Sequence, residues 1–194
     1  MERLMHRLCL ACALVLLPTS ATAAGPEEGA RASFERSHAK VSDLVDAGAS
    51  ATTIAREVDA LLDYASIAQA ALGGPSHYEA RCGDQCDAFE DLLTRLIRAN
   101  YLERITDERG ALEVVGAEVR ERATKVRTRV RFELEGRQQM LSIDYVMHEQ
   151  DDRWKVRDII TEDVSLARTY RYEIHELYKR GGMDLVLSTL EAKL

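Results

Sequence analysis

The chain has 194 residues, of which 46% are hydrophobic and 30% are charged, and its formal net charge is −7. This length suits one domain with its own hydrophobic core and is short for two. The composition is that of a folded globular protein and excludes a disordered one. The acidic charge argues against nucleic acid as a partner and against permanent attachment to an anionic membrane.

The first 23 residues have the pattern of a secretory signal peptide. Arg3 and Arg7 form a basic start, residues 8–17 are apolar, and residues 21–23 place small side chains before the expected cleavage site. The apolar run is about ten residues long, whereas a bilayer span needs roughly twenty. Lipoprotein processing at Cys12 and an uncleaved anchor remain as alternatives. We favour cleavage, which predicts a soluble exported protein with a net charge of −8, since Glu2, Arg3 and Arg7 are removed.

The first half of the mature chain predicts helices. Residues 24–31 are small and polar, and we expect a flexible leader there. Apolar residues recur at helical spacing over residues 32–47 and again over 54–72, and the Gly-Gly-Pro of residues 73–75 predicts the end of the second helix. A third helix is expected to begin after Ser76 or, by preference, near Asp84.

The second half predicts strands followed by helices. Apolar and polar residues alternate over 126–134 and 141–147, and shorter strands are expected over 112–119 and 154–160. Residues 165–179 return to helical spacing, and a last short helix follows Gly181-Gly182. The predicted fold class is α+β, with N-terminal and C-terminal helices packed on one face of a curved, mainly antiparallel four-stranded sheet. We expect residues 32–194 to form a single domain.

No motif of a hydrolase, a phosphate-binding loop or a zinc site is present, so we name no catalytic residue and no metal ligand. His175-Glu176 begins like a zinc motif but lacks the second histidine. The alternating residues Arg127, Arg129 and Arg131 form a row on one sheet face. We favour a solvated outer face, offset by acids such as Asp144, over docking of an acidic partner or lipid phosphates.

Cys82 and Cys86 are the two cysteines of the mature chain. An exported protein with two cysteines favours a disulfide, here closing a very short loop with a small stabilising effect. Free thiols, a redox-active pair or half of a metal site are the alternatives.

The C-terminal third resembles a known family. The matching residues are Trp154-Lys155-Val156-Arg157-Asp158, Val164-Ser165-Leu166, Tyr170-Arg171 and Gly181-Gly182-Met183-Asp184-Leu185, with Leu141-Ser142-Ile143-Asp144-Tyr145 and Leu62-Asp63-Tyr64 before them. Together they are similar to the pattern of the MlaC family, the periplasmic phospholipid-binding component of the Mla lipid-transport system, also called toluene-tolerance proteins. Two features depart from the family pattern: the cysteine pair, and Pro75-Ser76-His77-Tyr78 where the family has a tryptophan.

The resemblance implies a periplasmic carrier rather than an enzyme. Such a protein is expected to be a monomer without cofactor that shuttles a phospholipid between inner-membrane and outer-membrane complexes of an Mla-type ABC transport system. We expect residues 32–194 to form a single lipid-binding domain, with the acyl tails in an apolar cavity between sheet and helices. The candidate lipid-binding residues are the inward positions of the sheet and of the facing helices: Tyr64, Leu93, Ile97, Val130, Phe132, Leu141, Ile143, Tyr145, Val156 and Tyr170. Plain core packing of the same residues, a small periplasmic enzyme and a lipid-free adaptor remain as alternatives.

Overall fold

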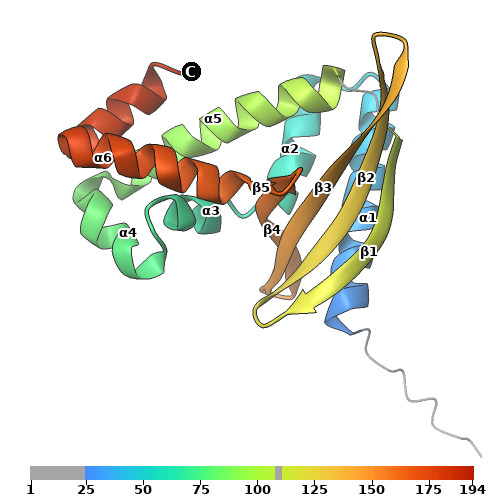
Figure 1. Cartoon of the computed structure of the whole chain (residues 1–194), viewed down its shortest axis with the longest axis horizontal. Helices are drawn as coiled ribbons and strands as arrows, with labels where there is room; N and C mark the ends of the chain where they lie inside the picture. The colour runs from blue at the N-terminus through green and yellow to red at the C-terminus, as the bar shows by residue number, and fades with distance from the viewer. Residues whose placement is uncertain (1–24, 108–110) are drawn as a thin grey trace, which may run out of the picture.

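The computed structural model describes residues 25–107 and 111–194, and the side chains in these ranges except those of residues 101–107. One helix lies along a twisted antiparallel sheet, and the other helices form a cluster beside one edge of it (Figure 1). No helix in the described ranges is long and apolar enough to cross a membrane. The signal peptide expected at residues 1–23 lies outside the described residues.

The sheet has five strands in the order β1-β2-β3-β4-β5, all antiparallel to their neighbours. Their bounds are β1 Ala111–Arg120, β2 Ala123–Leu134, β3 Arg137–Gln150, β4 Arg153–Thr161 and β5 Val164–Ser165. The predicted α+β fold is therefore confirmed, with a two-residue fifth strand in addition to the four expected. The turns between β2 and β3 and between β3 and β4 lie at Glu135-Gly136 and at Asp151-Asp152. Both use residues with positive φ, which two-residue hairpin turns require.

The N-terminal helices are α1 Pro26–Asp46, α2 Ala51–Leu61 and α3 Tyr64–Ala71. The prediction of a flexible leader over 24–31 is wrong for residues 26–31, because Pro26 fits the first turn of a helix and Ala30 is fully buried. The single helix expected over 54–72 is wrong as well. Asp63 interrupts it with non-helical backbone, where its N–H donates to the carbonyl oxygen of Val156 at 2.8 Å.

The remaining helices are α4 Pro75–Cys82, the short 3-10 helix η1 Gly83–Gln85, α5 Cys86–Asp107 and α6 Leu166–Glu191. Pro75 therefore begins a helix directly, two residues before His77, the earlier of the two predicted starts, while α5 begins close to the preferred start at Asp84. Within α6 the backbone of Gly181 and Gly182 is non-helical, with a φ of 66° at Gly182, so the predicted break between two helical segments is confirmed.

The core lies where α1, the helix cluster and the sheet meet. Helix α1 contacts β1 to β4, whereas α2, α3 and α6 contact β4 and α5 packs against the other helices (Figure 1). The largest side chains of this core are Phe34 of α1, Phe89 and Leu93 of α5, and Met147 of β3, each at most 2% exposed. One continuous hydrophobic cluster therefore joins the two parts of the domain.

Candidate functional site

Nine of the ten candidate lipid-binding residues lie in one of two environments. Five are buried members of the core cluster, namely Leu93, Ile97, Tyr145, Val156 and Tyr170. Four others are half-buried and lie together on the β2–β3 hairpin, namely Val130, Phe132, Leu141 and Ile143. Tyr64 is the exception, because its hydroxyl belongs to a polar network.

The four half-buried hairpin residues form what we call the apolar strip. Val130 lies opposite Leu141 in the β2–β3 register, and Ile143 lies opposite Thr128. Side chains of directly opposed residues share a face of the sheet, so the strip continues the inner face toward the turn of the hairpin. Thr128 is 1% exposed, and its hydroxyl donates to the carbonyl oxygen of Ile143 at 2.7 Å, so this polar group is satisfied within the sheet.

Helix α1 faces the apolar strip. The ring of Phe34 contacts the ring of Tyr145 with centroids 4.4 Å apart, which fixes the level of α1 along β3. Val41 lies about 10 Å further along the helix than Phe34, because a helix rises about 1.5 Å per residue. Leu141 lies about 13 Å further along the strand than Tyr145, because a strand rises about 3.3 Å per residue. Figure 1 shows α1 running along the sheet, so Val41, which is half-buried, lies near the level of the strip.

The Phe34–Tyr145 contact lies where the strip meets the core, since Ile143 of the strip packs against the core cluster. His38 follows one helical turn after Phe34, and their rings stack with centroids 6.1 Å apart. Burial lowers the pKa of His38 below its ordinary value, which favours the neutral imidazole. An aromatic group of Phe34, His38 and Tyr145 therefore closes the inner end of the strip with uncharged side chains. The histidine carried no sequence signal beyond its helical spacing.

Tyr64 holds three helices together. Its hydroxyl donates to Asp59 Oδ1 of α2 at 2.7 Å, and Arg98 of α5 donates to the same carboxylate at 3.0 Å. Burial raises the pKa of Tyr64, and the hydrogen bond to Asp59 raises it further. The sequence reasoning missed Asp59 and Arg98, because residues 39 positions apart give no local pattern. Tyr64 thus contributes a polar bond between α2, α3 and α5.

A second polar link joins the helix cluster to the sheet. The Asp63 carboxylate accepts hydrogen bonds from the Ser66 N–H and hydroxyl at 2.9 and 2.7 Å, and lies 2.7 Å from His148 Nε2 of β3. Burial acts to raise the pKa of Asp63, but the bonds from Ser66 and His148 outweigh it and leave this pKa below its ordinary value. The ionised carboxylate therefore caps α3 and binds β3 at the same time.

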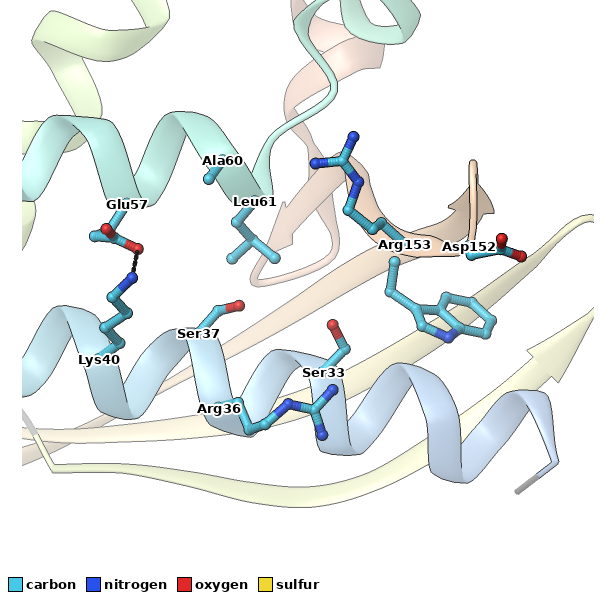
Figure 2. A pocket seen from close by; sticks show the side chains of 10 residues that line it. Ser33, Arg36, Ser37, Lys40, Glu57, Ala60, Leu61, Asp152 and Arg153 are labelled. Atoms are coloured by element: carbon cyan, nitrogen blue, oxygen red, sulfur yellow. Dashed lines mark ion pairs between the residues drawn. The ribbon is translucent and has the colours of Figure 1, made fainter. Parts of the chain in front are cut away.

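Two clefts in the described part of the chain are lined by none of the ten candidate residues. Cleft 1, of about 330 Å³, lies between α1, α2 and the β3–β4 connection (Figure 2). Cleft 2, of about 280 Å³, lies between the end of α3 and the start of α6, with Arg168 and Arg171 on its wall. Both contain several charged side chains, so they differ chemically from the apolar strip.

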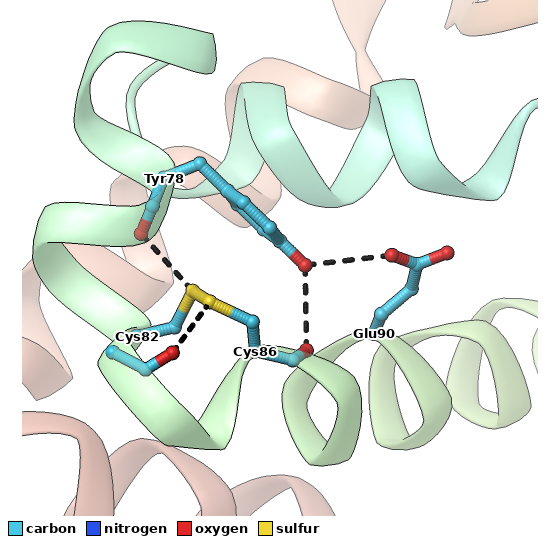
Figure 3. The surroundings of a disulfide bond; sticks show 5 residues. Tyr78, Cys82, Cys86 and Glu90 are labelled. Atoms are coloured by element: carbon cyan, nitrogen blue, oxygen red, sulfur yellow. Dashed lines mark hydrogen bonds between the residues drawn. A yellow bond between two sulfur atoms is a disulfide. The ribbon is translucent and has the colours of Figure 1, made fainter.

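The cysteine pair lies at the far side of the helix cluster. Cys82 and Cys86 are joined by a disulfide between the end of α4 and the first residue of α5, with their Cα atoms 4.8 Å apart (Figure 3). The Tyr78 hydroxyl donates to the carbonyl oxygen of Cys86 at 3.3 Å. Burial, together with the nearby Glu90, raises the pKa of Tyr78 to about 12. This bridge fixes the segment that departs from the family pattern.

The arginine row lies on the outer face of the sheet, as expected, but its charge balance differs from the expectation. Arg127, Arg129 and Arg131 are all exposed. Asp144 lies opposite Arg127, yet its carboxylate pairs with Lys125 at 2.7 Å. Arg131 pairs with Glu113 of β1 at 3.2 Å. Within the described residues, no group of three or more His, Cys, Asp or Glu side chains is arranged to hold a metal ion.

Known proteins share this architecture. No curated protein sequence matches the chain. Among solved structures, the phospholipid-binding protein from Ralstonia solanacearum in complex with a phospholipid has the same fold, with a TM-score of 0.70 and 18% sequence identity. The match covers 84% of this chain and 96% of that one. The family model described as MlaC protein matches residues 35–192, and the chain therefore belongs to the MlaC family.

Proposed function

We propose that this protein binds a phospholipid and carries it through the periplasm between inner-membrane and outer-membrane complexes of an Mla-type transport system. It would act as an exported monomer without a cofactor and without catalysing a reaction. Membership of the MlaC family supports the transport role. The solved relative that is similar in fold was obtained in complex with a phospholipid, which supports this class of cargo.

The apolar strip is the observation that carries the proposal. It continues a closed core yet stays half-buried, so the strip offers apolar surface that the protein itself covers incompletely. Each buried methylene contributes about 0.8 kcal/mol, so a tail of typical length gains roughly 12 kcal/mol from an apolar site. We propose that the tails contact Val130, Phe132, Leu141 and Ile143. Leu93, Ile97, Tyr145, Val156 and Tyr170 would form the deeper wall, and Tyr64 would hold that wall in place.

Solvent extraction and mass spectrometry of the purified, processed protein provide the direct test. We expect co-purifying phospholipid, and uptake of labelled phospholipid from liposomes by protein stripped of lipid. If the protein carries no phospholipid and takes up none, the carrier role is wrong and a lipid-free adaptor becomes the better explanation. Fractionation of cells that express the full chain tests the periplasmic location separately.

Two neighbouring residues of β3 provide a matched pair of variants. Leu141 belongs to the apolar strip, whereas Met140 is 58% exposed on the opposite face. We expect Leu141→Asn to lower phospholipid uptake strongly, because it places an amide where a tail would lie. Met140→Asn should leave uptake unchanged. Equal uptake by the two variants at equal thermal stability would contradict the placement of the tails.

A further inference from the structure

Cleft 1 joins three segments that are far apart in the sequence. Helix α1 contributes Ser33, Arg36, Ser37 and Lys40, which share one side because they follow the i, i+3, i+4, i+7 spacing. The end of α2, Asp152 of the β3–β4 turn, and Arg153 and Trp154 at the start of β4 complete the walls (Figure 2). The volume of about 330 Å³ is at the lower end of the range of roughly 300–1,000 Å³ for small-molecule sites, which fits a small polar group.

Cleft 1 holds positive charge that has no ion-pair partner among the described residues. Lys40 Nζ pairs with Glu57 across the cleft at 2.7 Å (Figure 2). Arg36 and Arg153 make no ion pair within residues 25–107 and 111–194, and Asp152 makes none there either. Two guanidinium groups, one ammonium group and two carboxylates leave the cleft with one net positive charge in a chain of net charge −7.

Hydrogen-bond donors of the cleft are also unused by the protein. The hydroxyls of Ser33 and Ser37 make no hydrogen bond to another side chain or to backbone in the described part of the chain. Both side chains are half-buried, and Figure 2 shows both hydroxyls on the side of α1 that faces α2. The cleft therefore presents neutral donors beside charged ones.

Trp154 gives the cleft a rigid wall. Its half-buried indole lies against α1 at Gly29, where a Cβ atom would come within 2.9 Å of Nε1. Gly29 therefore lets the ring approach the helix closely. Trp154 is also the one tryptophan of the chain, so its fluorescence reports on this cleft alone.

We propose that cleft 1 binds a phosphate group. Guanidinium groups bind phosphate oxygens in a bidentate manner, and the serine hydroxyls donate to the remaining oxygens. Figure 2 shows the Arg153 guanidinium pointing away from α1. Arg153 is exposed, so its side chain is free to turn toward α1, and one phosphate group then accepts from β4 and from α1 together. The head group of a phospholipid and free inorganic phosphate both supply this chemistry. This site goes beyond the carrier proposal and does not depend on it, since no residue of the apolar strip lines the cleft.

The test uses the processed protein and two soluble probes, sodium phosphate and glycerophosphocholine, at constant ionic strength. We expect a saturable change in Trp154 fluorescence, confirmed by calorimetry. Binding of glycerophosphocholine would identify a phosphodiester head group as the ligand, whereas binding of inorganic phosphate alone would identify a site for free phosphate. The absence of a saturable response to both probes would overturn the proposal.

A matched pair of double variants separates specific binding from general charge attraction. Arg36→Gln with Arg153→Gln should weaken binding about 10-fold or more, because charge-assisted hydrogen bonds are lost. Arg127→Gln with Arg129→Gln removes the same charge from the outer face of the sheet and should leave binding unchanged. Equal weakening by both pairs would also overturn the site. Phospholipid uptake, measured in parallel, tests the carrier role on its own.

Discussion

Replacement of Asp63 by alanine removes two connections at once. The carboxylate caps α3 through Ser66, and it also lies 2.7 Å from His148 Nε2 on β3. Asp63 is only 8% exposed, so water cannot replace these bonds fully. The backbone bond from Asp63 to Val156 survives the substitution, because it does not involve the side chain. The variant therefore tests the side-chain link between the helix cluster and the sheet.

The magnitude follows from the two connections. Loss of an N-cap costs about 1 kcal/mol, and loss of a hydrogen bond to a charged group costs about 1.5–3 kcal/mol. The His148 side chain is 20% exposed, which reduces the second contribution only in part. We expect Asp63→Ala to lower the free energy of unfolding by about 2–4 kcal/mol. Ser50→Ala is the matched control, because Ser50 caps α2 from an exposed position and should cost only about 1 kcal/mol.

The pH dependence has a definite sign. The pKa of Asp63 is lower in the folded protein than its ordinary value of 3.8. The ionised carboxylate therefore contributes its full stabilisation above this ordinary value, and the contribution is lost as the pH falls through the lower folded pKa. The contribution of the Asp63 carboxylate to the difference in stability between the original protein and Asp63→Ala should decrease as the pH falls below about 4.

Urea denaturation, followed by circular dichroism over a range of pH, measures these quantities. A double-mutant cycle of Asp63→Ala and His148→Gln should give a coupling of at least 0.5 kcal/mol, as expected for residues in direct contact. Two results would refute the reasoning. One is a cost of Asp63→Ala no larger than that of Ser50→Ala, and the other is full additivity in the cycle.

Three further substitutions test other parts of the structure. Gly29→Ala should displace the Trp154 indole and shift its emission to longer wavelength, since the added Cβ would lie 2.9 Å from Nε1; unchanged emission would contradict this contact. Replacing Cys82 and Cys86 by serine should lower the free energy of unfolding by about 2 kcal/mol in urea denaturation, as the five-residue loop predicts. Leu93→Ala should cost about 2–5 kcal/mol by the same assay because Leu93 is 1% exposed, and a smaller loss would indicate a loosely packed core there.

Two features of the sequence predicted most of the secondary structure: the alternation of apolar and charged residues, and the positions of glycine. Strand β2 was predictable because its apolar and charged residues alternate, which is the pattern of a sheet with one buried face. The break in α6 was predictable because Gly181-Gly182 admits non-helical backbone. Strand β5 was not predictable, because two residues are too few to show a period.

The break between α2 and α3 shows where local patterns fail. Apolar residues continue through Leu61, Leu62 and Ala65 at helical spacing, so the sequence predicts one helix. The backbone at Asp63 leaves the helix to bond Val156, which lies 93 positions further along the chain. Such a bond exists only after the sheet has formed beside the helices. The tertiary structure therefore decided this break, and with it the position of the Asp63–His148 link.

The candidate site, like the fold, could be predicted from the sequence only in part. The family pattern could be read from the sequence alone. So could the inward alternation that assigns Val130, Phe132, Leu141 and Ile143 to one face. The tertiary structure decided which inward residues are closed in the core and which form the half-buried strip, because exposure depends on where α1 and the helix cluster end. It also decided cleft 1, whose walls come from residues 33–40, 57–61 and 152–154. Polar residues in three separate segments have no common period, so only the fold brings them together.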